Sequence, residues 1–306
     1  MHTMRRRSVT VQVPATTANL GPGFDVLGMA LDTWNQVGIR MGGPAGVSVC
    51  GEGVEKLSRS RDNLVYRAAC RLFAEVGQSE PELSIACKNA IPLARGLGSS
   101  AAAVVGGLVA ANALLGEPLP QERLLLLATE MEGHPDNVAP ALLGGCRIVV
   151  RDGDRLIAAA VPLPADLRCV VYVPDQPLST DEMRRVLARE VTREEAVFNM
   201  GRVALLVNAL ATGDLGLLAV ATQDRLHQPA RQEVFPAMKH IIRAAMEAGA
   251  LGAFLSGSGS SVLALTKDRE MTIGYEMADA ASKANAPGTF KVMCPSAQGA
   301  HVIAIE

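Results

Sequence analysis

The segment that most constrains the fold is 92–102, Pro-Leu-Ala-Arg-Gly-Leu-Gly-Ser-Ser-Ala-Ala, which leads into a helix expected over 101–115. Glycine lets the backbone adopt positive φ and approach a ligand closely. The free amides and positive dipole end of the following helix would face that ligand. Ser99 and Ser100 add hydroxyls that can bond phosphate oxygens or a magnesium ion. The segment therefore predicts an anion site, most simply for a polyphosphate.

Two other phosphate motifs match this segment less well. A Walker A loop needs a lysine after its last glycine, and no lysine occurs between Lys88 and Lys239. The stretch Gly96–Ala101 fits a loose dinucleotide fingerprint, but residues 89–95 separate it from the preceding strand. It also lacks a clear strand ending in an acidic residue about 20 positions on. A glycine-rich helix start with only a packing role is the remaining alternative.

Composition narrows the class of protein. A chain of 306 residues can bury a large core in one or two domains, and 49 % apolar with 20 % charged residues is typical of a globular protein. A net charge of −2 and 3 % aromatic residues do not favour nucleic-acid binding. The six cysteines lack Cys-x-x-Cys spacing, which indicates buried thiols in a reducing compartment.

The sequence contains no pattern that predicts a membrane partner. No run of 18 or more apolar residues occurs. The basic start Met1–Ser8 precedes an alternating strand at 9–13, whereas a signal peptide would continue into an apolar core. We therefore expect a cytoplasmic protein that binds neither membrane nor nucleic acid.

Hydrophobic periodicity predicts mixed strands and helices. Strands are expected at 9–13, 37–41, 47–50, 83–87, 146–150, 168–173, 252–256, 261–266, 290–292 and 301–305. Helices are expected at 63–76, 101–115, 121–132, 194–211 and 236–248. A capping box at Ser179–Glu182 predicts another helix, reaching about Val191. Strands and helices do not alternate regularly, so an α+β fold is favoured, with a boundary near 151–164.

Three segments together resemble the GHMP superfamily of galactokinase, homoserine kinase, mevalonate kinase and phosphomevalonate kinase. They are Pro14–Gly28, the glycine–serine loop and Leu255–Ser261. Within this superfamily, Ala18–Asp25 and Gly133–Pro140 are similar to homoserine kinases. The resemblance covers essentially the whole chain. It implies two lobes, an N-terminal nucleotide-binding domain over 1–156 and a C-terminal ferredoxin-like domain over 157–306.

The resemblance implies ATP-dependent phosphorylation of the L-homoserine hydroxyl to O-phospho-L-homoserine, on the route to threonine, with ATP and Mg²⁺. Its metal ligands would be Glu130, favoured over Glu132, and a hydroxyl from Ser99 or Ser100. A homodimer is common in such enzymes. The implied nucleotide-binding residues are Asn63 for the base or ribose and, in the loop, Pro92, Leu93, Ala94, Arg95, Gly96, Leu97, Gly98, Ser99, Ser100, Ala101 and Ala102.

Homoserine carries a carboxylate, an ammonium and a hydroxyl, so its pocket needs a cation, an anion and polar donors. Arg184 and Arg231 match the family's carboxylate-binding arginines, a task that suits the guanidinium fork. The resemblance places the ammonium at Asp25. The other substrate-binding residues that it implies are Asn19, His134, Asn137, Thr180 and Gly257.

The residue at the position of the catalytic aspartate of galactokinase and mevalonate kinase is Asn137, which cannot accept a proton. Asp136 is adjacent but is expected to point elsewhere. We therefore hypothesise transfer without a strong protein base, with Asn137 and Ser100 as the catalytic residues and with catalysis by positioning and charge neutralisation. Two alternatives are a mevalonate-type or shikimate-like kinase and a ligand sensor that has lost transfer. The presence of the predicted metal acid and both loop serines disfavours the sensor.

Overall fold

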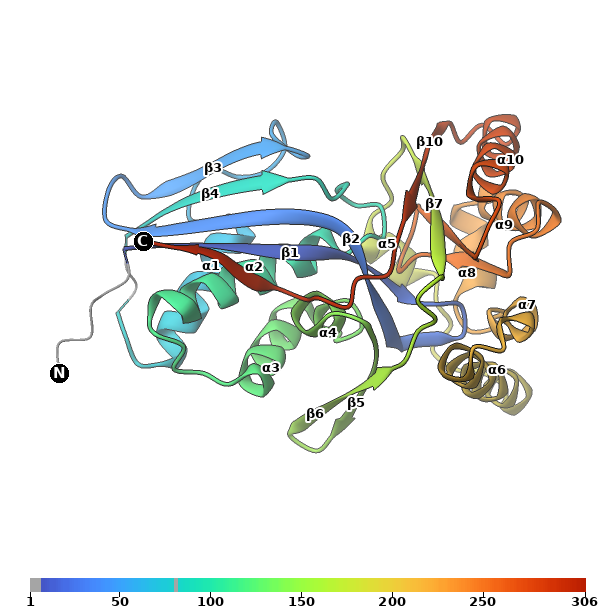
Figure 1. Ribbon diagram of the computed structural model, residues 1–306, viewed down its shortest axis with the longest axis horizontal. Coiled ribbons are helices and arrows are strands. Elements are labelled where there is room, and N and C mark those ends of the chain that lie inside the picture. Colours follow the sequence, from blue (N-terminus) through green and yellow to red (C-terminus); the bar gives the residue numbers. More distant parts are fainter. Residues whose placement is uncertain (1–6, 80–81) are drawn as a thin grey trace.

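The computed structural model describes residues 7–79 and 82–306, so the basic segment 1–6 lies outside the described residues. The elements form two lobes, a larger one built on a long sheet and a smaller one rich in helices (Figure 1). Within the described ranges, no helix is long and apolar enough to span a membrane. The mixed sheets and helices confirm the predicted α+β class.

The larger lobe is organised by a seven-stranded sheet with the order β11-β1-β2-β4-β3 and a β5–β6 hairpin joined to β2. The 19-residue β2 pairs with β4 through its second half and with β5 through residues 27–29. The strands are β1 (Ser8–Asn19), β2 (Gly23–Met41), β3 (Gly46–Gly51), β4 (Leu83–Asn89), β5 (Cys146–Asp152), β6 (Arg155–Val161) and β11 (His301–Ile305).

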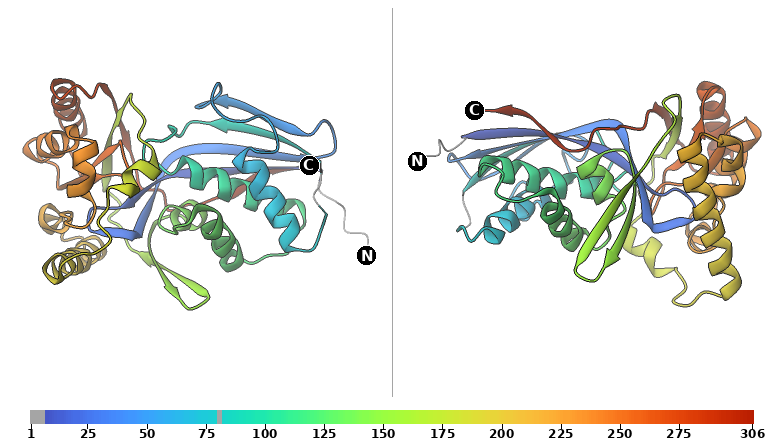
Figure 2. Two further views of the ribbon diagram at one scale, coloured as in Figure 1. Left: turned by 180° about the vertical axis from the view of Figure 1, so that it is seen from behind. Right: turned by 60° about the horizontal axis from the view of Figure 1, so that its bottom comes forward.

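One face of this sheet carries four helices, α1 (Leu64–Glu75), α2 (Ser99–Leu114), α3 (Gln121–Glu132) and α4 (Val138–Leu143), as Figures 1 and 2 show. The central helix α2 packs against α1, α3 and β1. It is apolar on all sides and buried along most of its length, as expected for a helix surrounded by protein. The beginning of α2 is thereby fixed against the sheet, and the glycine–serine loop immediately precedes it.

The smaller lobe contains a four-stranded antiparallel sheet in the order β10-β7-β9-β8. Its strands are β7 (Arg168–Pro174), β8 (Gly252–Leu255), β9 (Val262–Thr266) and β10 (Gly288–Met293). In chain order this is a β-α-β-β-α-β arrangement, the ferredoxin-like topology. Its helices are α5 (Thr180–Arg185), α6 (Arg193–Thr212), the 3₁₀ turn η1 (Leu215–Leu217), α7 (Leu218–Ala221), α8 (Gln228–Val234), α9 (Ala237–Glu247) and α10 (Glu270–Lys283).

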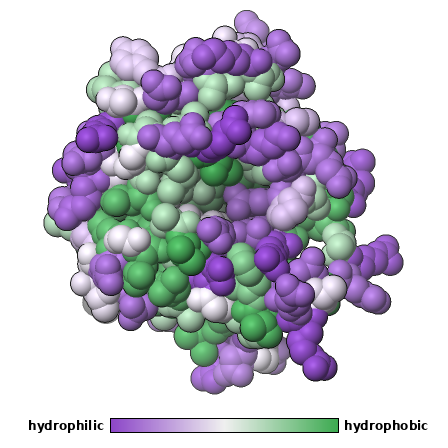
Figure 3. All heavy atoms as spheres, turned by 90° about the vertical axis from the view of Figure 1, so that its right-hand side faces the viewer, coloured by the Kyte–Doolittle hydropathy of each residue, from purple (hydrophilic) through white to green (hydrophobic). Residues whose placement is uncertain are grey.

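The chain passes between the lobes at several points. The predicted division at residues 156/157 falls inside β6, which pairs with β5 in the larger sheet. After β10 the chain returns to the larger lobe, where β11 pairs with β1. The β1–β2 turn extends the other way, and Asn199 Nδ2 of α6 donates to the Pro22 carbonyl at 3.1 Å. The outer face of the smaller lobe intersperses hydrophobic with hydrophilic side chains (Figure 3).

The ten predicted strands and the helices α1, α2, α3, α6 and α9 are confirmed, and their bounds differ from the predictions by a few residues or, for β1 and β2, by more. The helix predicted from Ser179 to Val191 is wrong, because α5 ends at Arg185 and Ser179 makes no capping hydrogen bond. Residues 188–192 are exposed, so no apolar face supports a longer helix there. The capping box occurs instead at Thr192, before α6. The sequence interpretation missed β6, α4, α7, α8 and α10.

The close packing of α2 on α1 makes Gly107 sensitive to substitution. A Cβ at Gly107 would lie 2.5 Å from the Val65 carbonyl oxygen, whereas one at Gly201, in exposed α6, would meet nothing within 4 Å. Gly107→Ala should lower the free energy of unfolding by about 1–3 kcal/mol. Gly201→Ala, the matched control, should raise it by about 0.5–1 kcal/mol. Urea unfolding measures both, and a Gly107→Ala protein as stable as wild type would contradict this packing.

Candidate active site

A cleft of about 440 Å³ lies where the two lobes meet. The glycine–serine loop and the residues after α3 line it from the larger lobe. The smaller lobe contributes α5, α8 and the turn between β8 and β9, and the end of β1 with the start of β2 completes the wall. The cleft therefore brings together segments from widely separated parts of the sequence.

The loop adopts a backbone that only glycine accommodates here. Gly96 and Gly98 have φ of 71° and 68°, and Gly98 directly precedes α2. A Cβ at Gly98 would lie 1.9 Å from Thr16 Oγ1, and one at Gly96 would lie 2.0 Å from the Ser256 carbonyl oxygen. The loop is thus enclosed between β1 and the β8–β9 turn. The N-terminus of α2 lies at the cleft, and the first amides of a helix can bind an anion there.

Hydrogen bonds attach the loop to both lobes. The Thr16 amide donates to the Leu97 carbonyl, and the Ser261 amide donates to the Arg95 carbonyl, each at 3.1 Å. The guanidinium of Arg95 donates through Nε to the Pro174 carbonyl at 2.6 Å. Arg95 lines the cleft, but its donors are largely used to connect the loop to the end of β7.

Two carboxylates near the end of α3 have different surroundings. Glu132 lines the cleft, and its Oε1 accepts a hydrogen bond from Ser100 Oγ. Burial raises the pKa of Glu132, although the Ser100 hydrogen bond acts in the opposite direction. Glu130 is 42 % exposed and pairs with Arg71 of α1 at 3.2 Å, outside the cleft. The carboxylate that faces the loop is therefore Glu132, whereas Glu130, the predicted metal ligand, does not line the cleft.

The residues after α3 form a hydrogen-bonded group. His134 Nδ1 lies 2.7 Å from Asp136 Oδ1, which also accepts from the Asn137 amide at 2.9 Å. Burial disfavours the charged imidazole, but the hydrogen bond and charge of Asp136 outweigh it, so the pKa of His134 is raised. Thr16 Oγ1 donates to Asn137 Oδ1 at 2.8 Å, which fixes Asn137 beside the loop.

Opposite the loop, charged groups come together from the smaller lobe and from β2 of the larger lobe. Asp25 and Arg184 form a bidentate pair with distances of 2.8 and 3.1 Å, each side chain being about one-third exposed. Asn19 supports Asp25, because its Oδ1 accepts from the Asp25 amide at 3.0 Å. Both residues have positive φ, 69° for Asn19 and 56° for Asp25, a backbone region that non-glycine residues rarely adopt.

A second arginine lies beside this pair. Arg231 is 1 % exposed, and its Nη1 donates to the Gly257 carbonyl at 2.9 Å. Burial, reinforced by the charge of Arg184, lowers the pKa of Arg231 to about 10, so the group remains cationic at neutral pH. Thr180 Oγ1 lies 3.1 Å from Ser258 Oγ at the same edge of the cleft.

The structure brings most of the predicted site residues to one cleft. Those that line it are Asn19, Asp25, Ala94, Arg95, Gly96, Leu97, Gly98, Ser99, Ser100, Ala101, His134, Asn137, Thr180, Arg184, Arg231 and Gly257. Pro92, Leu93, Ala102 and Asn63 do not line it. Ala102 is buried within α2, and Pro92 and Leu93 border a smaller neighbouring pocket.

Asn63 lies at an adjoining pocket of about 370 Å³, which shares Ser99 and Ser100 with the cleft. Its side chain is the N-cap of α1, with Oδ1 accepting from the Val65 amide at 3.0 Å. Its Nδ2 donates to the Ser58 carbonyl at 2.7 Å. Asn63 therefore holds the wall of this pocket through hydrogen bonds within the protein.

Sequence reasoning missed two buried residues behind the cleft, Asp224 and His227. Both have fully buried side chains and lie at the beginning of α8. A signal was present, because Pro229 marks the first turn of a helix and an aspartate a few residues before it is typical of a helix start. Their connection to Arg231 could be identified only from the structure.

A two-lobe α+β fold, with a glycine loop that opens a buried helix at the cleft between the lobes, defines a small-molecule kinase of the GHMP type. Two family models agree. The model described as GHMP kinases N terminal domain matches residues 63–145, and the GHMP kinases C terminal model matches residues 206–272.

Full-length relatives narrow the family. A homoserine kinase of Moorella thermoacetica is 48 % identical over 293 residues, covering 96 % of this chain and 99 % of the relative. One from a Synechococcus species is 49 % identical over 273 residues, covering 88 % and 89 %. The crystal structure of a homoserine kinase from Cytophaga hutchinsonii matches with a TM-score of 0.88 and 34 % identity, covering 99 % of each chain. The chain belongs to the homoserine kinase family.

Proposed function

We propose that this enzyme transfers the γ-phosphoryl group of ATP to the side-chain hydroxyl of L-homoserine, giving O-phospho-L-homoserine on the route to threonine. The observation that supports this most strongly is the cleft itself, which places an anion-binding loop opposite Asp25, Arg184 and Arg231. Phosphate binds at the loop, and a zwitterionic amino acid fits the three charged side chains opposite it. The names of the relatives agree with this acceptor.

The substrate half contains an ion pair that a zwitterion can replace. Arg184 and Asp25 pair with each other across the cleft wall. An amino acid would offer its carboxylate to the arginines and its ammonium to Asp25, so each charge exchanges one partner for another. A ligand with only one of these charges leaves a desolvated charge unpaired, which is costly. The cleft would therefore select α-amino acids.

The nucleotide half combines the loop with the adjoining pocket. The amides at the start of α2 suit the phosphates of ATP. The adjoining pocket, lined largely by apolar side chains such as Leu57, Leu64 and Val65, suits the adenine base. Ser99 and Ser100 border both cavities and would lie between base and phosphoryl acceptor. Asn63 contributes by holding the start of α1 at the pocket wall.

The residues at the loop fit a magnesium ion. Glu132 and the hydroxyl of Ser100 supply two oxygen donors beside the phosphate site. Within the described residues, no cluster of three or more His, Cys, Asp or Glu side chains forms a closed metal site. A site with only a few protein ligands suits Mg²⁺, because this ion retains several waters and binds nucleotide phosphates. When bound, the ion would neutralise phosphate charge.

Catalysis would depend on positioning. Asn137, held by Thr16, offers an amide near the acceptor site but no proton-accepting group. Asp136 is 2 % exposed, and its Oδ1 is already bonded to His134 and to the Asn137 amide. Phosphoryl transfer with a loose transition state needs alignment and charge stabilisation more than a strong base. A homodimer remains a prediction from the family resemblance.

The proposed acceptor predicts a specific pattern of turnover. Incubation with magnesium and ATP should convert homoserine to O-phosphohomoserine, identified by mass spectrometry. 4-Hydroxybutyrate lacks the ammonium and 3-aminopropan-1-ol lacks the carboxylate, so kcat/KM for each should fall on the order of 10²-fold or more. Turnover of mevalonate or shikimate without turnover of homoserine would refute the proposed acceptor, and ATP consumption independent of any acceptor would refute the kinase assignment.

The two acids near the end of α3 provide a matched pair of variants. Glu132→Gln should lower kcat on the order of 10²-fold and weaken Mg²⁺-dependent ATP binding in calorimetry, because a charged donor beside the phosphates is lost. Glu130→Gln removes only a surface pair with Arg71, so both measurements should stay within about 2-fold of wild type. The reverse ranking would return the metal role to Glu130.

A further inference from the structure

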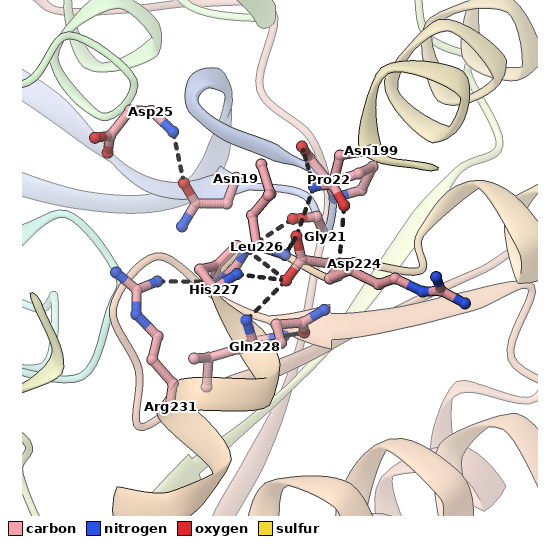
Figure 4. A network of polar contacts seen from close by, with 12 residues as sticks. Asn19, Gly21, Pro22, Asp25, Asn199, Asp224, Leu226, His227, Gln228 and Arg231 are labelled. Carbon is pink, nitrogen blue, oxygen red and sulfur yellow. Dashed lines mark hydrogen bonds and ion pairs between the residues drawn. The ribbon is translucent and has the colours of Figure 1, made fainter. Parts of the chain in front are cut away.

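A buried polar network lies directly behind the wall of the cleft, at the beginning of α8 (Figure 4). It runs from Asp224 through His227 to Arg231, whose guanidinium lines the cleft. The side chains of Asp224 and His227 are fully buried, and neither lines the cleft. The network therefore reaches the cleft through the guanidinium of Arg231.

Asp224 fixes the start of α8. Its Oδ2 accepts from the backbone amides of His227 at 3.0 Å and of Gln228 at 2.7 Å. Its Oδ1 accepts from Asn199 Nδ2 at 2.7 Å and from the Leu226 amide at 3.0 Å. These bonds satisfy both carboxylate oxygens at the positive end of the helix. Asp224 therefore places the backbone of His227 rigidly.

The hydrogen bonds of His227 determine its protonation state. Nε2 lies 2.7 Å from the Gly21 carbonyl oxygen, which can only accept, so Nε2 carries the proton. Nδ1 lies 2.9 Å from Arg231 Nη1, which can only donate, so Nδ1 must accept. The imidazole is neutral and has a single tautomer. Burial lowers the pKa of His227 to about 4, in agreement with this geometry.

Three acceptors hold one side of the Arg231 guanidinium. Nη1 donates to His227 and to the Gly257 carbonyl, and Nε lies 3.3 Å from the Met183 carbonyl. In residues 7–79 and 82–306 no acceptor is bonded to Nη2. Phe24 stacks on His227 with ring centroids 5.3 Å apart and lies 5.4 Å from the Arg231 guanidinium carbon. The neutral acceptors orient Arg231 without neutralising it.

The charges of the two arginines explain how this arrangement favours ligand binding. Arg184 has Asp25 as its bidentate partner, whereas Arg231 has no carboxylate within hydrogen-bond distance among the described residues. Two guanidinium groups converge on the cleft, and their mutual repulsion favours a bound anion. An aspartate in place of His227 would satisfy Arg231 internally and remove that preference. A neutral acceptor leaves the charge available to a ligand.

We propose that His227 is a positioning residue, anchored on the Gly21 carbonyl, that holds Arg231 so that Nη2 receives the carboxylate of the amino-acid substrate. This inference rests on the proposed function, in which Arg231 binds that carboxylate. Because Gly21 lies in the β1–β2 turn, just before the part of β2 that carries Asp25, the same imidazole sets the distance between the two ends of the substrate site.

Two isosteric variants separate the two ring nitrogens. Asparagine at position 227 places an amide oxygen near the Nδ1 position, so His227→Asn keeps an acceptor for Arg231. Glutamine places its amide near the Nε2 position, so His227→Gln keeps the bond to Gly21 and loses the acceptor. His227→Gln should raise KM for homoserine roughly 10- to 100-fold, the effect of a lost hydrogen bond to a charged group, with KM for ATP unchanged. His227→Asn should raise it less than about 5-fold.

Inhibitor binding adds a measurement that distinguishes the positioning of Arg231 from a merely structural role of His227. L-2-Aminobutyrate retains the carboxylate, so its Ki in His227→Gln should rise by the same factor as KM for homoserine. 3-Aminopropan-1-ol lacks the carboxylate, so its Ki should not change. Tyr172→Phe is the control, because it removes a partly buried hydrogen bond to the Ala286 carbonyl in the smaller lobe and should leave both Ki values unchanged.

Equal effects of the two variants, or equal loss of both inhibitors, would overturn the role of His227. If His227→Gln does not fold, the ¹⁵N NMR signals of the wild-type imidazole still test the proposal, because they report its protonation state and tautomer. A neutral Nε2–H tautomer between pH 5.5 and 8 is expected, and an imidazolium or Nδ1–H tautomer would overturn the proposal. Failure of the wild-type enzyme to phosphorylate homoserine would refute the proposed function instead.

Discussion

The enclosure of the glycine–serine loop between the lobes is the constraint on which the rest of the site depends. A side chain at Gly96 or Gly98 would collide with the backbone of the β8–β9 turn or with Thr16 of β1, so the loop conformation and the approach of the lobes require each other. The buried helix α2 fixes the loop from behind. The same contact that shapes the phosphate site thereby determines how far away the amino-acid half of the cleft lies.

The substrate half follows a complementary principle, since its charges are oriented by groups that do not fully neutralise them. Asn19 holds the backbone of Asp25, and His227 holds Arg231 through a neutral nitrogen. Of the two arginines, Arg184 is paired with a carboxylate, and its partner Asp25 is itself an expected ligand contact. Preorganised charges of this kind bind a zwitterion with little rearrangement of the protein. In the proposed mechanism, positioning rather than a catalytic base is the main contribution of the protein to transfer.

Much of the fold and of the candidate site was predictable, because the local sequence patterns agree with the tertiary structure. The helix over 121–132 and the loop before α2 were readable from periodicity and from glycine placement. The sequence could not distinguish Glu130 from Glu132. Residues that are two positions apart on a helix face different sides, and Arg71, the partner of Glu130, comes from another helix. The role of His227 was also inaccessible, since its contact with Gly21 joins residues 206 positions apart. The length of β2 was missed because its buried first half has no alternating pattern.

A crystal structure with homoserine and a non-hydrolysable ATP analogue tests the central claim most directly. The account predicts phosphates at the start of α2, the homoserine carboxylate on Arg184 and Arg231, its ammonium on Asp25, and its hydroxyl facing the γ-phosphate. The Arg184–Asp25 pair should be replaced by contacts with the ligand. A complex in which that pair stays intact and homoserine binds away from the loop would contradict the account.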